Sequence, residues 1–563
     1  MALLRGFIVS VLSVAWLGCG LSPSSIDQNA EAQSFDAKLA KAPAAYEAID
    51  GEYVVVFNSQ SGLYASFAHG NPINPDAPNQ TLQVLDSFPS LSAILVRDAS
   101  NGQSTLRSIA TDTSVSYIQQ NYKLDPWPIP QVVGAAKVIA SPSFFDQIQQ
   151  PAIWNLARID QPDWDAENPN DAFIWSEGIF GYGVRAYVID SGINPHPEFG
   201  CLDSFSEVCV NPGDDRIDEQ NAYPDPGQVD TVGHGTHVAG TLGGVNYGVA
   251  KGVTLVPINV DVGGQPTVAS MLAGMEHVLT VHSPEDFAVA NISISGPKNV
   301  LIDAAVNNLI QAGIPVVVAA GNNEAPISCE RSPANVPGAL TVAASNIQDE
   351  AALFSNQGSC VDVFAPGVDI LSAGRDGGTA ILSGTSMASP HVAGSVALLL
   401  EGVRNMDGGS IDPEGVAAVV NCTATPDALL DVDSSTANRL LYMRNFGSAG
   451  ILGYENLAEP PILSFAEPSP GAEVPNPVRI SANYETCALG SIKLEELDAP
   501  NGQVQRTIAP TTGKPSEWVA VFEPGPVYLR ATICDYFDHC VSEQTSFTAL
   551  PAASTIYLPI VGR

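Results

Sequence analysis

The pattern of apolar and polar positions divides the chain into three folded regions. In the first, residues 51–123, short apolar runs at 53–57, 92–96 and 115–118 predict strands. Residues 105–111 between them have the spacing of a short helix. We therefore expect a small α+β domain here.

The second region, residues 151–455, alternates strands, loops and helices. Four of its strands are continuous apolar runs, at 184–189, 255–260, 288–294 and 314–320. Strands that are apolar on both faces are typical of a parallel sheet buried between helix layers. The predicted fold class is therefore α/β, with a mainly parallel sheet covered by helices on both faces.

The third region, residues 459–550, follows Pro460 and Pro461. Short alternating strands, expected at 479–482, 517–522 and 527–533, are separated by Pro and Gly. This pattern favours an Ig-like β-sandwich. Residues 551–563 are expected to form a C-terminal tail.

Two connecting segments have their own composition. Residues 20–50 are small and polar and are expected to form a flexible lead. Prolines at 126, 128 and 130 disfavour helix, so residues 124–150 are expected to be an extended linker.

Residues 1–19 have the features of a signal peptide. Arg5 is the only charged residue before Asp27, and the apolar run at 7–17 is too short to span a bilayer comfortably. Residues 17–20 resemble a bacterial lipobox, in which Cys19 would carry a lipid. The alternative is cleavage downstream and a soluble product. Either way we expect a secreted or cell-surface protein of bacterial type, with a lipid on Cys19 as its only route to the membrane.

The cysteine count agrees with export. Nine cysteines are present, and without Cys19 an even number remains, which suits four disulfides in an oxidising compartment. Cys201 with Cys209, and Cys329 with Cys360, are candidate pairs. The last four cysteines allow three connectivities: Cys422, Cys487, Cys534 and Cys540.

The charge excludes one class of partner. The chain of 563 residues has a formal net charge of −37, which repels nucleic acids and anionic lipids. The acidic residues are spread along the chain without a long run, which indicates a solvated surface rather than an acidic tail.

Three segments of the second region contain candidate catalytic residues. Asp190 follows the apolar run at 184–189, and functional groups of open α/β sheets lie at the carboxyl ends of strands. Alone, an aspartate there is more often a turn residue or helix cap. His234 lies between Gly233 and Gly235 where a helical pattern begins, and we interpret it as a general base.

A metal site at His234 is the weaker interpretation. His237 is three residues further on, but the glutamate of a zinc-binding HExxH motif is missing, and Gly235 has no side chain to act as a base.

Ser386 is the third candidate. It opens a helical pattern that continues through residues 398–400. The first turn of a helix has unsatisfied N–H groups and the positive end of the helix dipole, which would stabilise an oxyanion. The alternative is a simple helix cap.

Together these segments resemble the three signatures of the subtilisin-like serine peptidases, in the order Asp, His, Ser. The α/β-hydrolase motif G-x-S-x-G is not met, because Ala388 occupies the last glycine position. Residues 316–323 resemble the family strand that supplies an asparagine to the oxyanion, here Asn322. The resemblance implies a serine endopeptidase acting on proteins or peptides through an acyl-enzyme, with Asp190, His234, Ser386 and Asn322 as its catalytic residues.

The segments 321–323, 327–329 and 354–367 resemble the proteinase K and aqualysin branch of that family. Residues 51–123 resemble its inhibitor-type propeptide, and 154–159 resemble the start of its mature domain. The resemblance implies a monomeric, autoprocessed zymogen that is cut between residues 123 and 150. Its own propeptide would act as an intramolecular inhibitor.

The predicted substrate-binding residues depart from the family pattern. Residues 293–296 match the family's Ser-Leu-Gly-Gly, but Ser295 replaces the glycine that usually lines the primary pocket, and Pro266 has no N–H to offer a substrate backbone. These changes predict a narrower cleft and restricted specificity. The full predicted set is Ser293, Ile294, Ser295, Gly296 and Gly321.

One structural metal is implied as well. The carbonyls of Pro337 and Ala339 and the carboxylate of Asp362 match a calcium site of that branch, and hard oxygen ligands suit Ca²⁺. The alternative is a solvated loop.

Two other functions fit part of the pattern. A decayed core could serve only as a surface binding protein, but all four predicted catalytic positions are present. An acyl-enzyme could also pass its acyl group to an amine, which would make the protein a peptide ligase or cyclase.

Overall fold

The computed structural model describes most of the chain between residues 35 and 550. The described residues are 35–58, 82–98, 104–128, 131–134, 148–149, 152–166, 172–174, 179–200, 216–224, 229–325, 327–405, 409–443, 462–475, 478–485, 489–499, 503–508, 517–520, 522–535 and 540–550. The predicted signal peptide and C-terminal tail lie outside them. In these residues no helix has both the length and the apolar character needed to cross a membrane.

The described residues form two compact units, and the smaller one is built from residues 35–41, 50–87 and 92–120. Its elements are α1 (Phe35–Lys38), β1 (Leu39–Ala40), β2 (Ala48–Phe57), β3 (Leu82–Phe88), β4 (Ala93–Asp98), α3 (Ser104–Ala110) and β5 (Val115–Tyr122). The sheet order is β1-β5-β2-β4-β3. The predicted strands and helix lie within these elements, and apolar side chains such as Val55, Ile94 and Ile118 form the core.

The expectation of a flexible lead over residues 20–50 is wrong for its described part. Residues 35–40 form α1 and β1, and β1 pairs in parallel with β5. The weak local pattern of these residues gave no sign of this, because a two-residue strand is stabilised by its partner and not by its own sequence.

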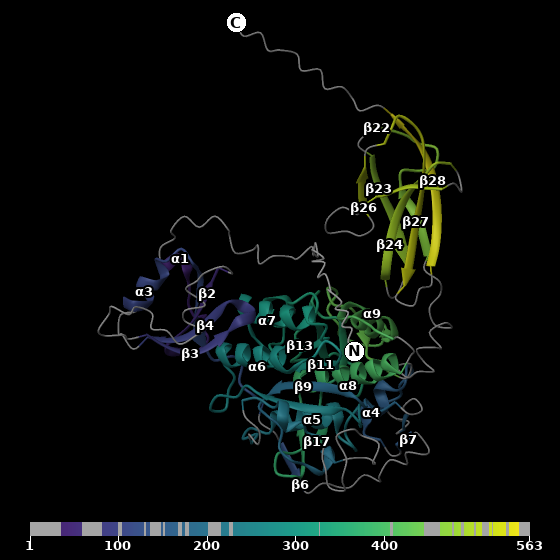
Figure 1. Cartoon of the computed structure of the whole chain (residues 1–563). Helices are drawn as coiled ribbons and strands as arrows, with labels where there is room; N and C mark the ends of the chain where they lie inside the picture. Colours follow the sequence, from purple (N-terminus) through teal and green to yellow (C-terminus); the bar gives the residue numbers. More distant parts are fainter. Residues whose placement is uncertain are drawn as a thin grey trace, which may run out of the picture. The chain divides into compact units, whose positions relative to one another are not determined.

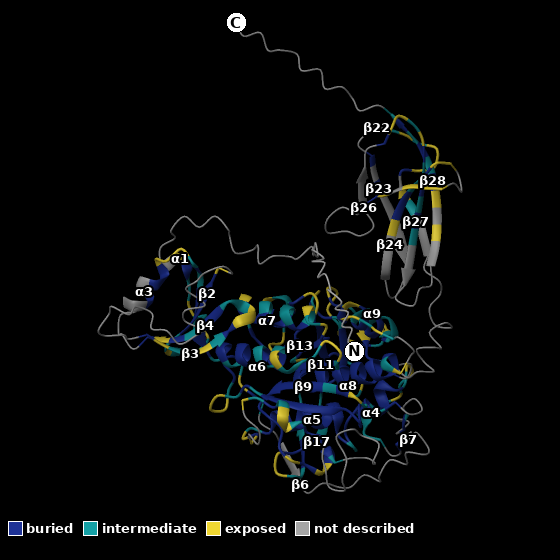
Figure 2. Cartoon of the chain, in the orientation of Figure 1, coloured by how far each residue is buried: buried dark blue, intermediate teal, exposed yellow. Residues whose placement is uncertain are grey.

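The larger unit contains the mainly parallel sheet that was expected, and this sheet has eight strands. Its order is β10-β9-β11-β13-β15-β16-β20-β19, and only the β19–β20 pair is antiparallel. The strands are β9 (Val184–Asp190), β10 (Thr254–Asn259), β11 (Phe287–Ile292), β13 (Val316–Ala319), β15 (Leu340–Ser345), β16 (Val363–Pro366), β19 (Thr425–Pro426) and β20 (Arg439–Leu440). The central strands are largely buried on both faces (Figure 2), which is why their sequences are mostly apolar.

Helices cover both faces of this sheet. Helices α5 (His234–Gly243) and α8 (Thr385–Arg404) contact each other on one face, and α6 (Val268–Val281) and α7 (Val300–Gln311) contact each other on the other face (Figure 1). Two further helices are α4 (Trp154–Ile159) and α9 (Pro413–Thr423). The predicted α/β fold class, a mainly parallel sheet between helix layers, is therefore confirmed.

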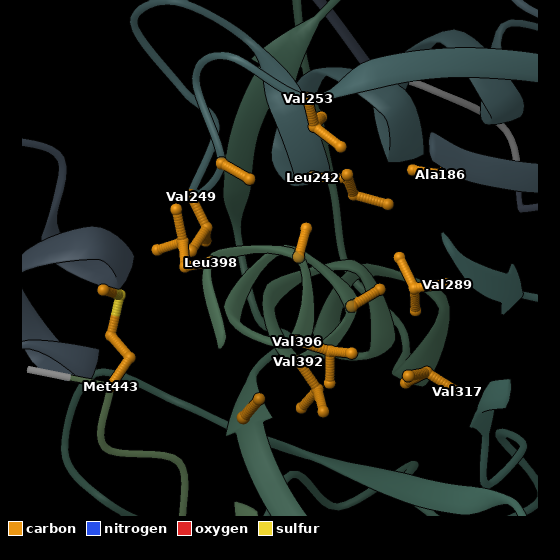
Figure 3. Packing of buried hydrophobic residues seen from close by; sticks show 14 of the residues in the cluster. Ala186, Leu242, Val249, Val253, Val289, Val317, Val392, Val396, Leu398 and Met443 are labelled. Carbon is orange, nitrogen blue, oxygen red and sulfur yellow. The ribbon is translucent and has the colours of Figure 1, made fainter. Parts of the chain in front are cut away.

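Helix α8 is the centre of the hydrophobic core. Val392, Val396 and Leu398 project from it among Val289 of β11, Val317 of β13 and Leu242 of α5 (Figure 3). Almost the whole helix is buried, so apolar residues are not confined to one stripe, and buried polar side chains such as His391 and Glu401 are hydrogen-bonded. This core fixes where the helix begins, and Ser386 lies in its first turn.

Parts of the predicted linker belong to sheets. β6 (Gln131–Gly134) pairs with β18 (Thr379–Leu382), which pairs with β17 (Ile370–Ala373), and β7 (Ile148–Gln149) pairs with β8 (Phe173–Ile174). After Pro130 the backbone again has N–H groups to donate, and these strand partners are distant in sequence. The expectation of a continuous linker over 124–150 is therefore too simple.

Residues 462–550 form two sheets of the predicted β-sandwich type. One has the order β21-β23-β26 and the other β22-β28-β27-β24-β25. The strands are β21 (Ile462–Glu467), β22 (Glu473–Pro475), β23 (Val478–Glu485), β24 (Leu489–Leu497), β25 (Val504–Ile508), β26 (Glu517–Ala520), β27 (Gly525–Asp535) and β28 (Cys540–Leu550). Side chains from both sheets, including Ile480, Leu529 and Phe547, share one core.

One of the expected disulfides is present: Cys329 and Cys360 are joined. Cys201, Cys209 and Cys487 lie outside the described residues. Cys534 and Cys540 are opposite each other in the β27–β28 register. A disulfide between them stays a prediction.

The crossing of α5 and α8 predicts a sensitive position at Gly394. A Cβ there would lie 2.7 Å from the Cβ of Val249 and 2.9 Å from the carbonyl oxygen of Leu242. Gly394→Ala should therefore lower the free energy of unfolding by about 1–3 kcal/mol, measured by urea denaturation. Val300→Ala, at an exposed position of α7, is the control and should change it by less than about 0.5 kcal/mol. Equal stability of both variants would contradict the close approach.

Candidate active site

Asp190 and His234 meet at the carboxyl edge of the parallel sheet. Asp190 ends β9 and His234 begins α5. The Nδ1 atom of His234 lies 2.7 Å from Oδ1 of Asp190, and both side chains are fully buried. Helix α5 can start this close to β9 because residue 235 is glycine: a Cβ there would lie 2.2 Å from the carbonyl oxygen of Gly192.

The environment of Asp190 acts on its charge in two directions. Burial raises the pKa of the Asp190 carboxyl, while the positive charge available on His234 and the N–H of Ser191 oppose that rise. The carboxylate is thus held in a low-dielectric site where a protonated imidazole is its natural counter-ion.

A second buried carboxylate, Asp230, holds the loop that leads into α5. Its Oδ1 accepts hydrogen bonds from the hydroxyl of Ser191 and the N–H groups of Val232 and Gly233. Its Oδ2 accepts from the N–H and the hydroxyl of Thr236. These five bonds fix the residues on both sides of His234. Sequence reasoning did not identify Asp230, because a carboxylate in a polar loop has no distinctive pattern.

Ser386 lies at the second residue of α8, but its hydroxyl does not reach His234 in this structure. It donates to the carbonyl of Ser293 at 3.1 Å. Nε2 of His234 is buried and has no hydrogen-bond partner among the described residues. The structure thus joins the acid and the imidazole and leaves the Ser–His bond unmade. A rotation about the serine Cα–Cβ bond redirects such a hydroxyl.

Asn322 lies beside the start of α8. Its Oδ1 accepts from the N–H of Thr385 at 2.9 Å and from the Thr385 hydroxyl at 3.0 Å. With the oxygen fixed in this way, the amide nitrogen remains to donate toward a ligand. Gly321, whose φ is +98°, allows the turn that places Asn322 there.

The predicted substrate-binding residues are buried and adjoin Ser386. Ser293, Ile294 and Ser295 connect β11 to β12 (Gly296–Pro297). The Ser293 hydroxyl donates to the carbonyl of Ser386 at 2.9 Å. A Cβ on Gly321 would lie 2.8 Å from Oγ of Ser295, so Gly321 and the segment at 293–296 face each other.

Residues 123–125 of the chain lie along this segment. The N–H of Leu124 donates to the carbonyl of Pro266 at 2.8 Å, and the N–H of Asp125 donates to the carbonyl of Ser295 at 3.1 Å. Lys123 forms an antiparallel bridge with Thr267. Pro266 therefore contributes its carbonyl here, and Thr267 caps α6.

Trp127 lies over His234. The two ring centroids are 4.8 Å apart, and the indole N–H donates to Asp261 at 3.0 Å. Sequence analysis placed Trp127 in a linker and missed this contact. A buried tryptophan between two prolines was the available signal, but its position over the imidazole depends on tertiary structure.

The surroundings of His237 bear on the metal site that was considered at His234 and His237. The Nε2–H group of His237 donates to the carbonyl oxygens of Ile370 and Ala380, and burial lowers the pKa of this imidazole to about 3. Nε2 of His237 is therefore engaged with backbone carbonyls and not with a ligand of His234. No cluster of three or more His, Cys, Asp or Glu side chains that could hold a metal occurs in the described part of the chain.

The predicted calcium ligands are the carboxylate of Asp362 and the carbonyls of Pro337 and Ala339. Oδ2 of Asp362 accepts from the N–H of Thr341 at 2.8 Å, which brings the carboxylate to the strand that follows Pro337 and Ala339. Burial raises the pKa of Asp362 to about 6. Such a desolvated carboxylate is an oxygen donor that gains from a nearby cation.

Comparison with known proteins identifies the family of this chain. The profile of the subtilase family matches residues 181–447. Alkaline serine exoprotease A of Vibrio alginolyticus is 37% identical over 438 residues, which cover 75% of this chain and 73% of the relative. Extracellular serine proteinase of a Thermus species is 40% identical over 299 residues, covering 52% and 67%.

One solved structure is also similar. The crystal structure of a cold-adapted subtilisin-like serine proteinase is 39% identical, covers 52% of this chain and 99% of its own, and superposes with a TM-score of 0.45.

The Asp230 network predicts a local loss of order on substitution. In Asp230→Asn the amide oxygen cannot accept five hydrogen bonds, and the NH₂ group would face the N–H groups of the loop. We expect amide hydrogen exchange of residues 230–240 to become at least about tenfold faster. Asp218→Asn, at the carboxylate that caps a remote turn at 219–221, should leave that segment unchanged. Equal exchange in both variants would contradict the role of Asp230.

Proposed function

The chain belongs to the subtilase family of serine endopeptidases, and we propose that it cuts peptide bonds with Ser386 as nucleophile, His234 as base and Asp190 as the orienting acid. The observation that supports this most strongly is the buried Asp190–His234 hydrogen bond beside the first turn of α8. We propose in addition that the protein is exported and made as an autoprocessed zymogen.

The first half of the reaction would form the acyl-enzyme. The Ser386 oxygen attacks the scissile carbonyl carbon, and its proton moves to Nε2 of His234. Collapse of the tetrahedral intermediate breaks the C–N bond, and the imidazolium gives that proton to the leaving amine. Water then repeats the sequence against the ester, which releases the acid product and restores Ser386.

Two groups would stabilise charge during these steps. Asp190 faces the imidazolium across 2.7 Å and keeps the ring in the tautomer whose Nε2 can accept a proton. The oxyanion would be met by the N–H of Ser386 and by the amide nitrogen of Asn322, whose oxygen is held by Thr385.

The segment at 123–127 supports the zymogen proposal. It lies along the proposed substrate-binding residues, covers His234 with Trp127, and stands at the start of the proposed cleavage region. The hydroxyl of Ser386 is turned to Ser293 at the same time. While this segment remains in place, a substrate cannot reach the imidazole, so the precursor should be latent.

Labelling with a fluorophosphonate tests the catalytic proposal. We expect the wild-type protein to be labelled and Ser386→Ala to remain unlabelled and uncut in its precursor form. Asn322→Ala should still be labelled, with kcat reduced about 10²- to 10³-fold on a peptide substrate, because only one oxyanion donor is lost. Amino-terminal sequencing of the labelled band locates the maturation site. Equal labelling of Ser386→Ala would reject the assignment.

We also propose a structural calcium ion at the Pro337 and Ala339 carbonyls and the Asp362 carboxylate. Subtilases commonly bind calcium, and the donors here are oxygens of the kind that Ca²⁺ prefers. The bound ion would compensate the charge of a carboxylate that burial disfavours.

Removal of calcium should therefore destabilise the protein. The thermal midpoint should fall by several degrees in excess chelator and recover with added Ca²⁺. In Asp362→Asn the midpoint should no longer respond to either treatment. An unchanged wild-type midpoint in chelator would reject the site.

A further inference from the structure

A buried arginine adjoins the substrate-binding segment. Arg331 begins β14 (Arg331–Ser332), which is antiparallel to β12 and therefore lies beside Gly296 and Pro297. Only 7% of Arg331 is exposed. A guanidinium is always charged, so a buried one needs a hydrogen-bond acceptor or a counter-ion. The groups around Arg331 therefore indicate which kind of side chain it binds.

Three groups surround the guanidinium. Its Nε donates to the hydroxyl of Ser295 at 3.2 Å, and its Nη1 donates to the hydroxyl of Tyr46 at 2.9 Å. Its Nη2 forms an ion pair with the carboxylate of Asp125. The hydroxyl of Tyr46 donates to the other oxygen of that carboxylate at 2.8 Å.

Asp125 is presented on a backbone that is bound as a peptide substrate would be. Residues 123–125 form an extended segment between residues 265–267 and 293–296, with hydrogen bonds to the carbonyls of Pro266 and Ser295. The side chain of Gln265 donates to the carbonyl of Leu124. Backbone hydrogen bonds of this kind form with a peptide of any sequence. Selectivity between peptides therefore comes from contacts with their side chains.

The partners of Arg331 lie close to the proposed catalytic residues. Ser295 is two residues from Ser293, whose carbonyl accepts the Ser386 hydroxyl. Two residues after Asp125, Trp127 lies over His234. A carboxylate at Arg331 therefore belongs to the part of a bound chain that precedes the reactive centre by only a few residues.

We propose that Arg331 is a specificity-determining residue that selects an acidic side chain one to three residues before the cleaved bond. This inference rests on the proposed peptidase function and names its substrate class. Asp125 holds the place of that side chain in the precursor. Once the residues before the mature domain leave, Tyr46 and Asp125 leave with them, and of these three partners the guanidinium keeps Ser295.

An aspartate or glutamate of the substrate restores the ion pair. A neutral side chain at the same place leaves a buried charge without its counter-ion, which is costly. Ser295 orients the guanidinium in this arrangement. Its hydroxyl accepts a hydrogen bond from Nε, which leaves the other guanidinium nitrogens to face the bound chain.

The experiment uses the matured protein and internally quenched peptides in which each of the three positions before the cut is Asp, Glu, Asn or Gln. Mass spectrometry of the products locates the cut. We expect kcat/KM for an acidic residue at one position to exceed that for its amide by about 10²-fold. Equal rates for the acid and amide peptides would overturn the proposal.

Variants assign the preference to Arg331. Arg331→Gln should reduce the acid-to-amide ratio to nearly one, and Arg331→Glu should favour peptides with lysine at that position. Arg185→Gln, at an ion-paired arginine at the start of β9, is the matched control and should keep the wild-type ratio. A preference that survives in Arg331→Gln would overturn the assignment.

Labelling of Ser386 separates this inference from the proposed function. Protein that is not labelled by a fluorophosphonate rejects the peptidase mechanism and this inference with it. Protein that is labelled but cuts acid and amide peptides equally rejects the inference alone. If the Arg331 variants fail to fold, the acid-to-amide ratio of the wild type still decides between acceptance and rejection.

Discussion

The close approach between the end of β9 and the start of α5 is the constraint on which the site depends. Only glycine at position 235 leaves room for the Gly192 carbonyl, and this contact brings Nδ1 of His234 to 2.7 Å from Asp190. Asp230 then fixes the loop by five hydrogen bonds. Because these groups are buried, their geometry is set before a substrate arrives, which is what stabilising charge in a transition state requires.

The core extends that constraint to the nucleophile. Helix α8 is buried along almost its whole length and contacts both the sheet and α5. The position of its first turn is therefore determined by packing of Val392, Val396 and their neighbours. Ser386 and Asn322 are joined through Thr385, so the proposed nucleophile and oxyanion donor move as one unit with that helix.

The proposed substrate-binding segment at 293–296 is contacted by the protein's own chain. Residues 123–125 supply the backbone hydrogen bonds, Asp125 neutralises Arg331, and Trp127 covers His234. One short segment thus satisfies a buried cation and shields a base. The chain has 23 basic and 60 acidic residues, so positive charges are few. A buried arginine beside the proposed substrate-binding residues is therefore suited to distinguish acidic from neutral side chains of a substrate.

The sequence by itself determined the parallel sheet and singled out Asp190, His234, Ser386 and Asn322 as the candidate catalytic residues. Apolar runs report burial on both faces, and short motifs report the ends of strands and helices, which are local properties. Tertiary structure alone decided the roles of Asp230, Trp127 and Arg331, the pairing of β6 with β18, and the direction of the Ser386 hydroxyl. Each of these depends on partners distant along the chain, and a buried charge or ring is explained only by the groups that surround it.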